Sequence, residues 1–206
     1  MDFADLAAFT IHDAKNRLAL VATRAEANGD AETLRGILES SASLTRLLAY
    51  YKAEKESLGA EIDARVPADL VNELALDIGK QTTLTISADW SGAPQLWFYD
   101  ENLVRMVLLN ALYNALRKKK KNIVISAVDR NEWLEFSIAD DGAGFPPEQL
   151  GEQQNMQPVS RDGTGLGLYL AQRVAALHRN AGRTGRIELN NEGGAVFRLL
   201  LPQYKE

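Results

Sequence analysis

Two glycine-rich loops carry residue types that could bind a nucleotide. The first spans residues 140–144 (DDGAG) and follows a predicted strand over 134–139. Gly142 and Gly144 let the backbone turn tightly and approach a ligand. The Asp140 carboxylate can accept a hydrogen bond from an amino group such as the exocyclic amine of adenine. Taken alone, the pattern is equally typical of an ordinary turn.

The second loop, residues 163–167 (GTGLG), leads directly into a predicted helix. It offers backbone N–H groups and a helix N-terminus to phosphate oxygens. It is not a Rossmann fingerprint, because no strand–helix–strand unit surrounds it, and it lacks the Gly-Lys-Ser/Thr of a Walker A loop. The alternative is a loop that merely precedes a helix. The residues expected to contact a nucleotide here are Gly163, Thr164, Gly165, Leu166 and Gly167.

A helix predicted over residues 100–119 carries two asparagines, Asn110 and Asn114, whose spacing of four places them on one face. Amides on an apolar helix cost free energy unless something satisfies them. A Mg²⁺ ion that retains waters and bridges nucleotide phosphates would satisfy Asn114, and Arg117 could donate to a phosphate. Asparagines that cross-link a protein core are the alternative.

Reactive side chains are scarce, since the 206 residues include two histidines and no cysteine. The lack of cysteine excludes disulfides, thiolate metal sites and thiol catalysis, and two histidines argue against a multi-histidine metal site. We expect His178 to end a helix, where a partly positive ring suits the helix dipole. His12 lies on a predicted N-terminal helix and, taken alone, would be interpreted as a surface residue.

The elements that must position these residues fall into two parts. Residues 2–28 and 31–57 show helical periodicity, and the short connection between them predicts an antiparallel helical hairpin. Its apolar stripe needs a cover. Self-association of two chains into a four-helix bundle is the economical solution, and packing on the rest of the same chain is the alternative.

From about residue 60 the pattern changes to mixed helices and strands, with an irregular polar stretch at about 147–162. The fold class is therefore predicted as α+β, with a helical hairpin at residues 1–58 and an α/β sandwich at residues 59–206. The expected elements of the sandwich are helices at 67–79, 100–119 and 165–178, strands at 83–90 and 95–99, and strand pairs 122–128 with 133–139 and 186–190 with 195–201.

Charge and hydropathy restrict the partners. The chain has 28 acidic residues against 23 Lys and Arg, a net charge of −5, which argues against nucleic acid as a partner. No apolar run reaches the roughly 20 residues needed to span a bilayer, and the N-terminal sequence MDFADLAAF lacks the basic region of a signal peptide. We therefore expect a cytoplasmic protein.

The three nucleotide motifs, in the order asparagine helix, D-x-G-x-G and G-x-G-x-G, together resemble the ATP-binding (GHKL) domain shared by sensor histidine kinases, DNA gyrase, Hsp90 and the MutL repair proteins. The resemblance covers residues 61–206 and implies an α/β sandwich that binds ATP and Mg²⁺. It implies that Asp140 contacts adenine, that Asn114 binds Mg²⁺ and that residues 163–167 surround the phosphates. Asn110 and Arg117 are implied as further nucleotide contacts.

Residues 9–18 (FTIHDAKNRL) resemble the phosphoacceptor box of histidine kinases, an H-[DE]-x-x-N pattern on the first helix of a dimerising hairpin. The resemblance implies that a neutral His12 ring attacks the γ-phosphoryl group of ATP, while Asp13 holds the other ring nitrogen. Asp13 and Asn16 also match a family pattern that orients water for removing phosphate from a receiver domain. Phosphatase activity is therefore an open possibility.

ATP-hydrolysing members of this superfamily carry a glutamate where this chain has Asn110, and an amide cannot act as a general base. The leading hypothesis is a homodimeric histidine kinase core that passes a phosphoryl group from ATP through His12 to a response-regulator aspartate. Since His12 lies near the start of the sequence, we expect input from a separate sensor protein, unless the chain is an excised core. The alternatives are a histidine phosphotransferase or docking dimer without autokinase activity, and a GHKL ATPase.

Overall fold

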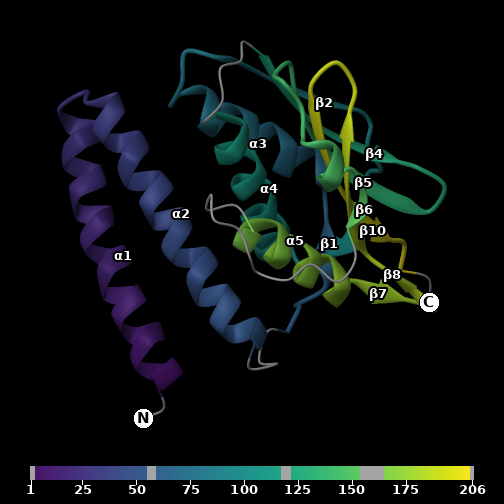
Figure 1. The fold of residues 1–206 in the computed structure, drawn as a ribbon, viewed down its shortest axis with the longest axis horizontal. Coiled ribbons are helices and arrows are strands. Elements are labelled where there is room, and N and C mark those ends of the chain that lie inside the picture. Colours follow the sequence, from purple (N-terminus) through teal and green to yellow (C-terminus); the bar gives the residue numbers. More distant parts are fainter. Residues whose placement is uncertain (1–2, 55–58, 117–121, 154–164, 205–206) are drawn as a thin grey trace. The chain divides into compact units, whose positions relative to one another are not determined.

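The structure is a computed structural model that describes residues 3–54, 59–116, 122–153 and 165–204 (Figure 1). The chain divides into two compact units, Met1–Leu58 and Gly59–Glu206. In the part of the chain that the structure describes, no helix is both long enough and apolar enough to cross a bilayer.

The first unit consists of helices α1 (Phe3–Ala27) and α2 (Ala31–Glu54), which pack along each other. Gly29 turns the chain between them with a positive φ of 67°, a conformation that suits glycine. Asp30 caps α2, because its Oδ1 accepts the backbone N–H of Thr33 at 3.0 Å. The helix bounds lie within three residues of those predicted from periodicity.

Apolar side chains of this unit differ widely in exposure. Ile11, Ala25 and Ile37 are buried. Leu20 and Val21 of α1 remain 68% and 46% exposed. The two helices therefore leave part of their apolar surface in contact with solvent.

The second unit is built on a six-stranded mixed sheet with the strand order β2-β4-β5-β10-β9-β6. Its strands are β2 (Thr85–Gly92), β4 (Asn122–Asp129), β5 (Trp133–Asp140), β6 (Gly151–Gln153), β9 (Arg186–Asn191) and β10 (Ala195–Pro202). Only β2 and β4 pair in parallel, and the other neighbours are antiparallel. The antiparallel pairs β4–β5 and β9–β10 are the two strand pairs predicted from the sequence.

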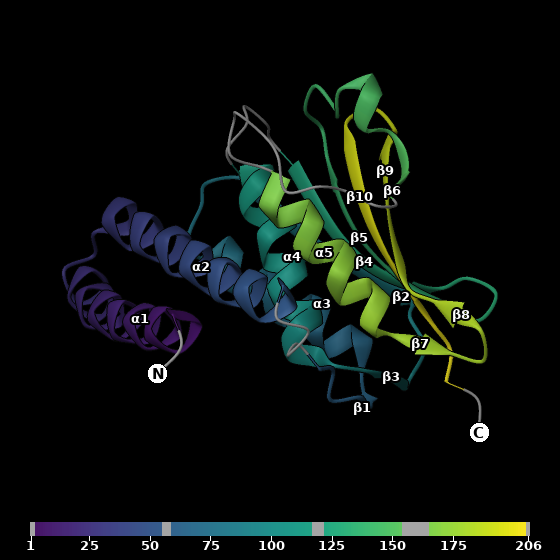
Figure 2. The same ribbon diagram turned by 60° about the horizontal axis from the view of Figure 1, so that its bottom comes forward.

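Helices α3 (Pro67–Gly79), α4 (Glu101–Leu116) and α5 (Gly165–Leu177) cover one face of this sheet (Figure 2). Alternate residues of β4 and β5 point into the layer between helices and sheet. Those with no exposed surface are Ile123, Ile125, Leu134 and Phe136. Burial of this apolar layer is the main favourable contribution to folding of the unit.

The strands expected at 83–90 and 95–99 are both present, and they belong to different sheets: β2 joins the six-stranded sheet, while β3 (Trp97–Tyr99) pairs with β1 (Asp63–Arg65). The stretch expected to be irregular contains a 3-10 helix, η1 (Pro147–Gln149), and the edge strand β6. A second small pair, β7 (Arg179–Asn180) with β8 (Arg183–Thr184), follows α5.

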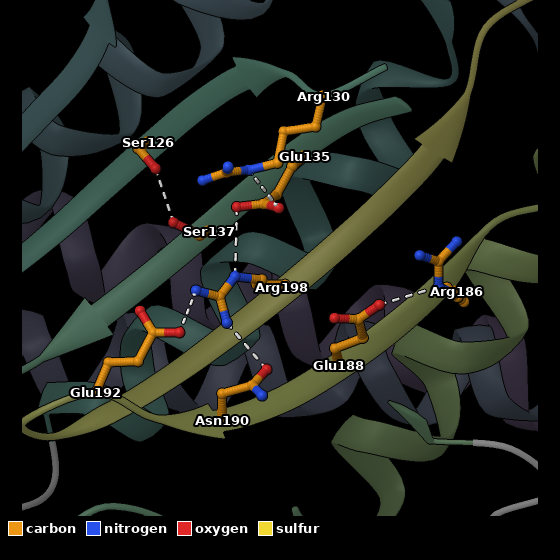
Figure 3. A network of polar contacts seen from close by, with 9 residues as sticks. All are labelled: Ser126, Arg130, Glu135, Ser137, Arg186, Glu188, Asn190, Glu192 and Arg198. Carbon is orange, nitrogen blue, oxygen red and sulfur yellow. Dashed lines mark hydrogen bonds and ion pairs between the residues drawn. The ribbon is translucent and has the colours of Figure 1, made fainter. Parts of the chain in front are cut away.

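The sheet face away from the helices carries charged side chains (Figure 3). Glu135 is 5% exposed and accepts ion pairs from Arg130 at 3.0 Å and from Arg198 at 3.3 Å. Arg198 also donates to Asn190 at 2.9 Å and to Glu192 at 2.6 Å. This network links β5, β10 and the end of β9 at the turn that connects β9 to β10.

His178 follows the last residue of α5, as expected, but its ring is not positive. It is fully buried, its Nδ1 lies 2.8 Å from the Val174 carbonyl oxygen, and its Nε2 accepts the backbone N–H of Asp100 at 3.0 Å. Burial lowers the pKa of His178 below its ordinary value. The ring is therefore neutral, with the proton on Nδ1, and it ties the end of α5 to the residue before α4.

Candidate nucleotide-binding site

The first glycine loop begins at the end of a buried strand. β5 ends at Asp140, whose Oδ1 accepts the backbone N–H groups of Gly142 at 2.8 Å and Ala195 at 3.4 Å. These hydrogen bonds orient the carboxylate. An oriented carboxylate suits the recognition of an amino group on a flat ring, the contact predicted for Asp140.

The neighbouring aspartate has a different function. Asp141 is exposed, and its Oδ2 accepts both the backbone N–H of Asn122 at 3.2 Å and the side-chain amide of the same residue at 2.8 Å. It therefore ties the loop to the first residue of β4. Of the two adjacent carboxylates, Asp141 serves the fold and Asp140 remains the candidate for ligand recognition.

Gly144 occupies a position that only glycine suits. Its φ is +83°, and a Cβ there would lie 2.6 Å from Oδ1 of Asn191. That side chain bonds the residue after the glycine at both of its backbone groups: Oδ1 accepts the N–H of Phe145 at 2.8 Å, and Nδ2 donates to its carbonyl at 3.0 Å. The loop is thus held against the end of β9.

The sequence analysis missed this contribution from the β9–β10 turn. A Cβ at Gly194 would clash with the carbonyl oxygen of Asp140, and Ala195 donates its N–H to the carboxylate of the same residue. The pair Gly193-Gly194 was the only local signal that a backbone approaches closely here. No pattern in the sequence marks Asn191.

Helix α4 brings Asn110 to the second glycine loop. Asn110 is 6% exposed, and a Cβ at Gly167 would clash with its amide nitrogen and lie 2.9 Å from its Oδ1. Gly167 lies in the first turn of α5 together with Gly165 and Leu166. The predicted asparagine face and the predicted phosphate loop are therefore neighbours in the structure.

Asn114 lies one turn further along α4 and is half-buried. Its amide oxygen is the hard type of ligand that Mg²⁺ accepts, and Mg²⁺ commonly takes one or two protein ligands and completes its shell with phosphate oxygens and water. The donor at this position thus fits the expected ion. Arg117, Gly163 and Thr164 lie outside the described residues, and their nucleotide contacts stay predictions.

The phosphoacceptor pattern lies on the first unit. His12, Asp13 and Asn16 all belong to α1, and the spacing of four places Asn16 one turn from His12 on the same side of the helix. The only other histidine, His178, is buried with both ring nitrogens engaged. Of the two histidines of the chain, His178 has no nitrogen available to attack a phosphoryl group.

Comparisons with known proteins identify a family and several related kinases. Residues 99–205 match the family model described as histidine kinase-, DNA gyrase B-, and HSP90-like ATPase. The chain is 33% identical over 154 residues to the adaptive-response sensory kinase SasA of Synechococcus sp. (strain CC9902), covering 68% of this chain and 38% of that protein. It is 28% identical over 204 residues to the sensor histidine kinase HprS of Escherichia coli K12, covering 92% of this chain and 43% of that protein.

Solved structures show the same fold. Full-length ShkA in complex with AMPPNP superposes with a TM-score of 0.67 at 20% identity, covering 100% of this chain and 47% of that one. The catalytic domain of the histidine kinase ThkA superposes with a TM-score of 0.60, also at 20% identity, covering 70% of this chain and 99% of that one.

This chain spans less than half the length of the two curated relatives above. The family match itself covers the asparagine helix and both glycine loops. The chain therefore belongs to the family of histidine kinase-, DNA gyrase B- and HSP90-like ATPases.

Proposed function

We propose that this chain is the catalytic core of a two-component histidine kinase. Residues 59–206 bind ATP with Mg²⁺, and residues 1–58 form the dimerisation and phosphoacceptor hairpin. His12 receives the γ-phosphoryl group and passes it to an aspartate in the receiver domain of a response regulator. The named kinases among the relatives support this choice within the family.

The engagement of His178, the second of the two histidines, is the observation that carries the proposal. His178 is buried, neutral and bonded at both ring nitrogens. His12 follows a spacing that places Asp13 beside it and Asn16 one turn away. If a histidine of this chain accepts phosphate, it is His12.

The transfer needs a neutral nucleophile and a held nucleotide. The lone pair of a His12 ring nitrogen attacks the γ-phosphorus, the bond to the β–γ bridging oxygen breaks, and ADP leaves with that electron pair. The Asp13 carboxylate accepts a hydrogen bond from the N–H of the other ring nitrogen and stabilises the positive charge that develops on the ring. In the second step an aspartate oxygen attacks the phosphorus, and the phosphorus–nitrogen bond breaks.

The residues of the nucleotide site contact different parts of the bound ATP and Mg²⁺. Asp140 accepts a hydrogen bond from the adenine amine, while Asn110 and Arg117 contact the nucleotide. The loop of Gly163, Thr164, Gly165, Leu166 and Gly167 surrounds the phosphates, and Gly142 and Gly144 allow the first loop to approach. Asn114 would hold Mg²⁺, which neutralises charge on the phosphate oxygens.

The proposal includes two partners. A second copy of the chain covers the exposed side chains Leu20 and Val21 of α1 in a four-helix bundle, because α2 leaves these apolar side chains in contact with solvent. A response-regulator receiver domain accepts the phosphoryl group. Asp13 and Asn16 on the same helix would orient water for a separate phosphatase reaction, in which the phosphoaspartate of the receiver domain is hydrolysed to aspartate and inorganic phosphate.

A turnover experiment separates the kinase from its two alternatives. The chain is mixed with a small excess of Mg·ATP, and ADP and inorganic phosphate are measured separately over time. The proposal predicts ADP up to one equivalent per chain without inorganic phosphate, and no ADP from a His12→Gln variant. Continuous phosphate release that survives His12→Gln would establish an ATPase instead. ATP binding without ADP formation would establish a docking or phosphotransfer protein.

A further inference from the structure

The turn between β9 and β10 contacts both ends of the first glycine loop. At the start of the loop, Ala195 donates its N–H to the Asp140 carboxylate, and Gly194 allows the two backbones to touch. At the end of the loop, Asn191 bonds both backbone groups of Phe145. The loop is thus closed by residues about fifty positions away in the sequence.

The two adjacent asparagines at the end of β9, before this turn, face opposite ways. Asn191 is directed at the loop, whereas Asn190 accepts a hydrogen bond from Arg198 on the outer face of the sheet (Figure 3). Arg198 is also paired with Glu192 and with the buried Glu135. The outer network therefore holds the turn in place and leaves the Asn191 amide to hold the loop.

We propose that Asn191 is a positioning residue for nucleotide binding. Its amide replaces the backbone partners that Phe145 would have in a continued strand, and so it keeps the Asp140–Phe145 loop in the conformation that a nucleotide needs. Without the amide, the loop must be ordered when the ligand binds, and the ordering entropy reduces affinity. The inference rests on the proposed ATP site.

The test compares Asn191→Ala with Asn190→Ala in the full chain. Both variants remove one asparagine amide from the same strand end, but only the first breaks contacts to the loop. Binding of a non-hydrolysable ATP analogue with Mg²⁺ is measured by calorimetry. The backbone amide of Phe145 is followed by hydrogen exchange, and the urea midpoint of each protein is recorded.

We expect Asn191→Ala to raise the dissociation constant about tenfold, which corresponds to about 1.4 kcal/mol, and to speed exchange at Phe145. The dissociation constant of Asn190→Ala should stay within about twofold of that of the wild type, because Arg198 keeps its two acidic partners, Glu135 and Glu192. The dissociation constant of Asn191→Asp should lie between those of the wild type and Asn191→Ala, because a carboxylate accepts a hydrogen bond from the Phe145 N–H but cannot donate one to the Phe145 carbonyl.

The outcomes separate this inference from the proposed function. If the wild type does not bind the analogue, the ATP site itself is wrong. If the wild type binds and Asn191→Ala binds equally well, Asn191 does not position the loop. If both alanine variants lose affinity in proportion to a lower urea midpoint, the effect is general destabilisation and the inference is also overturned.

Discussion

Replacing Gly167 by alanine probes the contact between the second glycine loop and helix α4. The new Cβ would clash with the amide nitrogen of Asn110 and lie 2.9 Å from its Oδ1 and 3.0 Å from its Cγ. Asn110 is 6% exposed, so its short side chain has little space in which to move. In a helix without this neighbour, alanine is more stable than glycine by up to ~1 kcal/mol.

The two effects have opposite signs, and the neighbour decides which is larger. Overpacking a filled site typically costs ~1–3 kcal/mol. After subtraction of the helix preference, Gly167→Ala should lower the free energy of unfolding by about 0–2 kcal/mol. In an Asn110→Ala background the clash disappears, and the same substitution should raise the free energy of unfolding by up to ~1 kcal/mol.

Urea denaturation of the wild type, both single variants and the double variant measures this reversal. The coupling between the two positions should reach about 1–3 kcal/mol, within the range of residues in direct contact. Gly79→Ala at the end of α3 is the matched control, because a Cβ at Gly79 would meet nothing within 4 Å. Its effect should be the same in both backgrounds. Equal effects of Gly167→Ala in both backgrounds would refute the contact.

Burial lowers the pKa of His178, so below about pH 6.5 the unfolded chain binds a proton that the folded chain does not, and the free energy of unfolding falls. Urea midpoints measured between about pH 5 and 7.5 should show this loss in the wild type, and an unchanged profile in His178→Gln would contradict it. Asp140→Ala should abolish calorimetric binding of an ATP analogue, whereas Asp141→Ala should preserve it; equal losses would show that the two carboxylates are not distinguished. Glu135→Ala should lower the free energy of unfolding by about 1–3 kcal/mol, because it leaves the largely buried Arg198 without one partner. An unaltered urea midpoint would show that the network adds no stability.

Local sequence signals predicted the elements whose ends are chemically marked. α3 begins at Pro67 and ends at Gly79, as expected, because proline suits a first helical turn and glycine suits a helix end. The pairs β4–β5 and β9–β10 were predicted because each joins two alternating or apolar segments through a short connection.

Pairings that depend on distant residues were not predicted. β2 pairs with β4 only after the chain has passed through β3 and α4, so no local pattern in the sequence marks this pairing. β6 is three residues long and lies in a polar stretch, and its strand character comes from pairing with β9. Tertiary context decides such short strands.

The candidate site shows the same division. Gly144 and Gly167 were predicted as loop glycines because glycine allows close approach of the backbone, and the structure places side-chain atoms of Asn191 and Asn110 against them. Asn191 contacts a residue 46 positions away, and no local pattern reveals such a contact. His178 was expected at the end of a helix, but its neutral state follows from burial and from the hydrogen bond that Nε2 accepts from the backbone N–H of Asp100, which is 78 positions away.

Mapping the label after incubation with γ-labelled ATP shows whether His12 accepts the phosphoryl group. We expect label on the chain that is stable in base and labile in acid, as a phosphorus–nitrogen bond requires. We also expect the label to be located at His12 and to be absent from His12→Gln while that variant still binds ATP. Label that persists in His12→Gln, or a wild type that binds ATP and remains unlabelled, would rule out His12 as the phosphoacceptor.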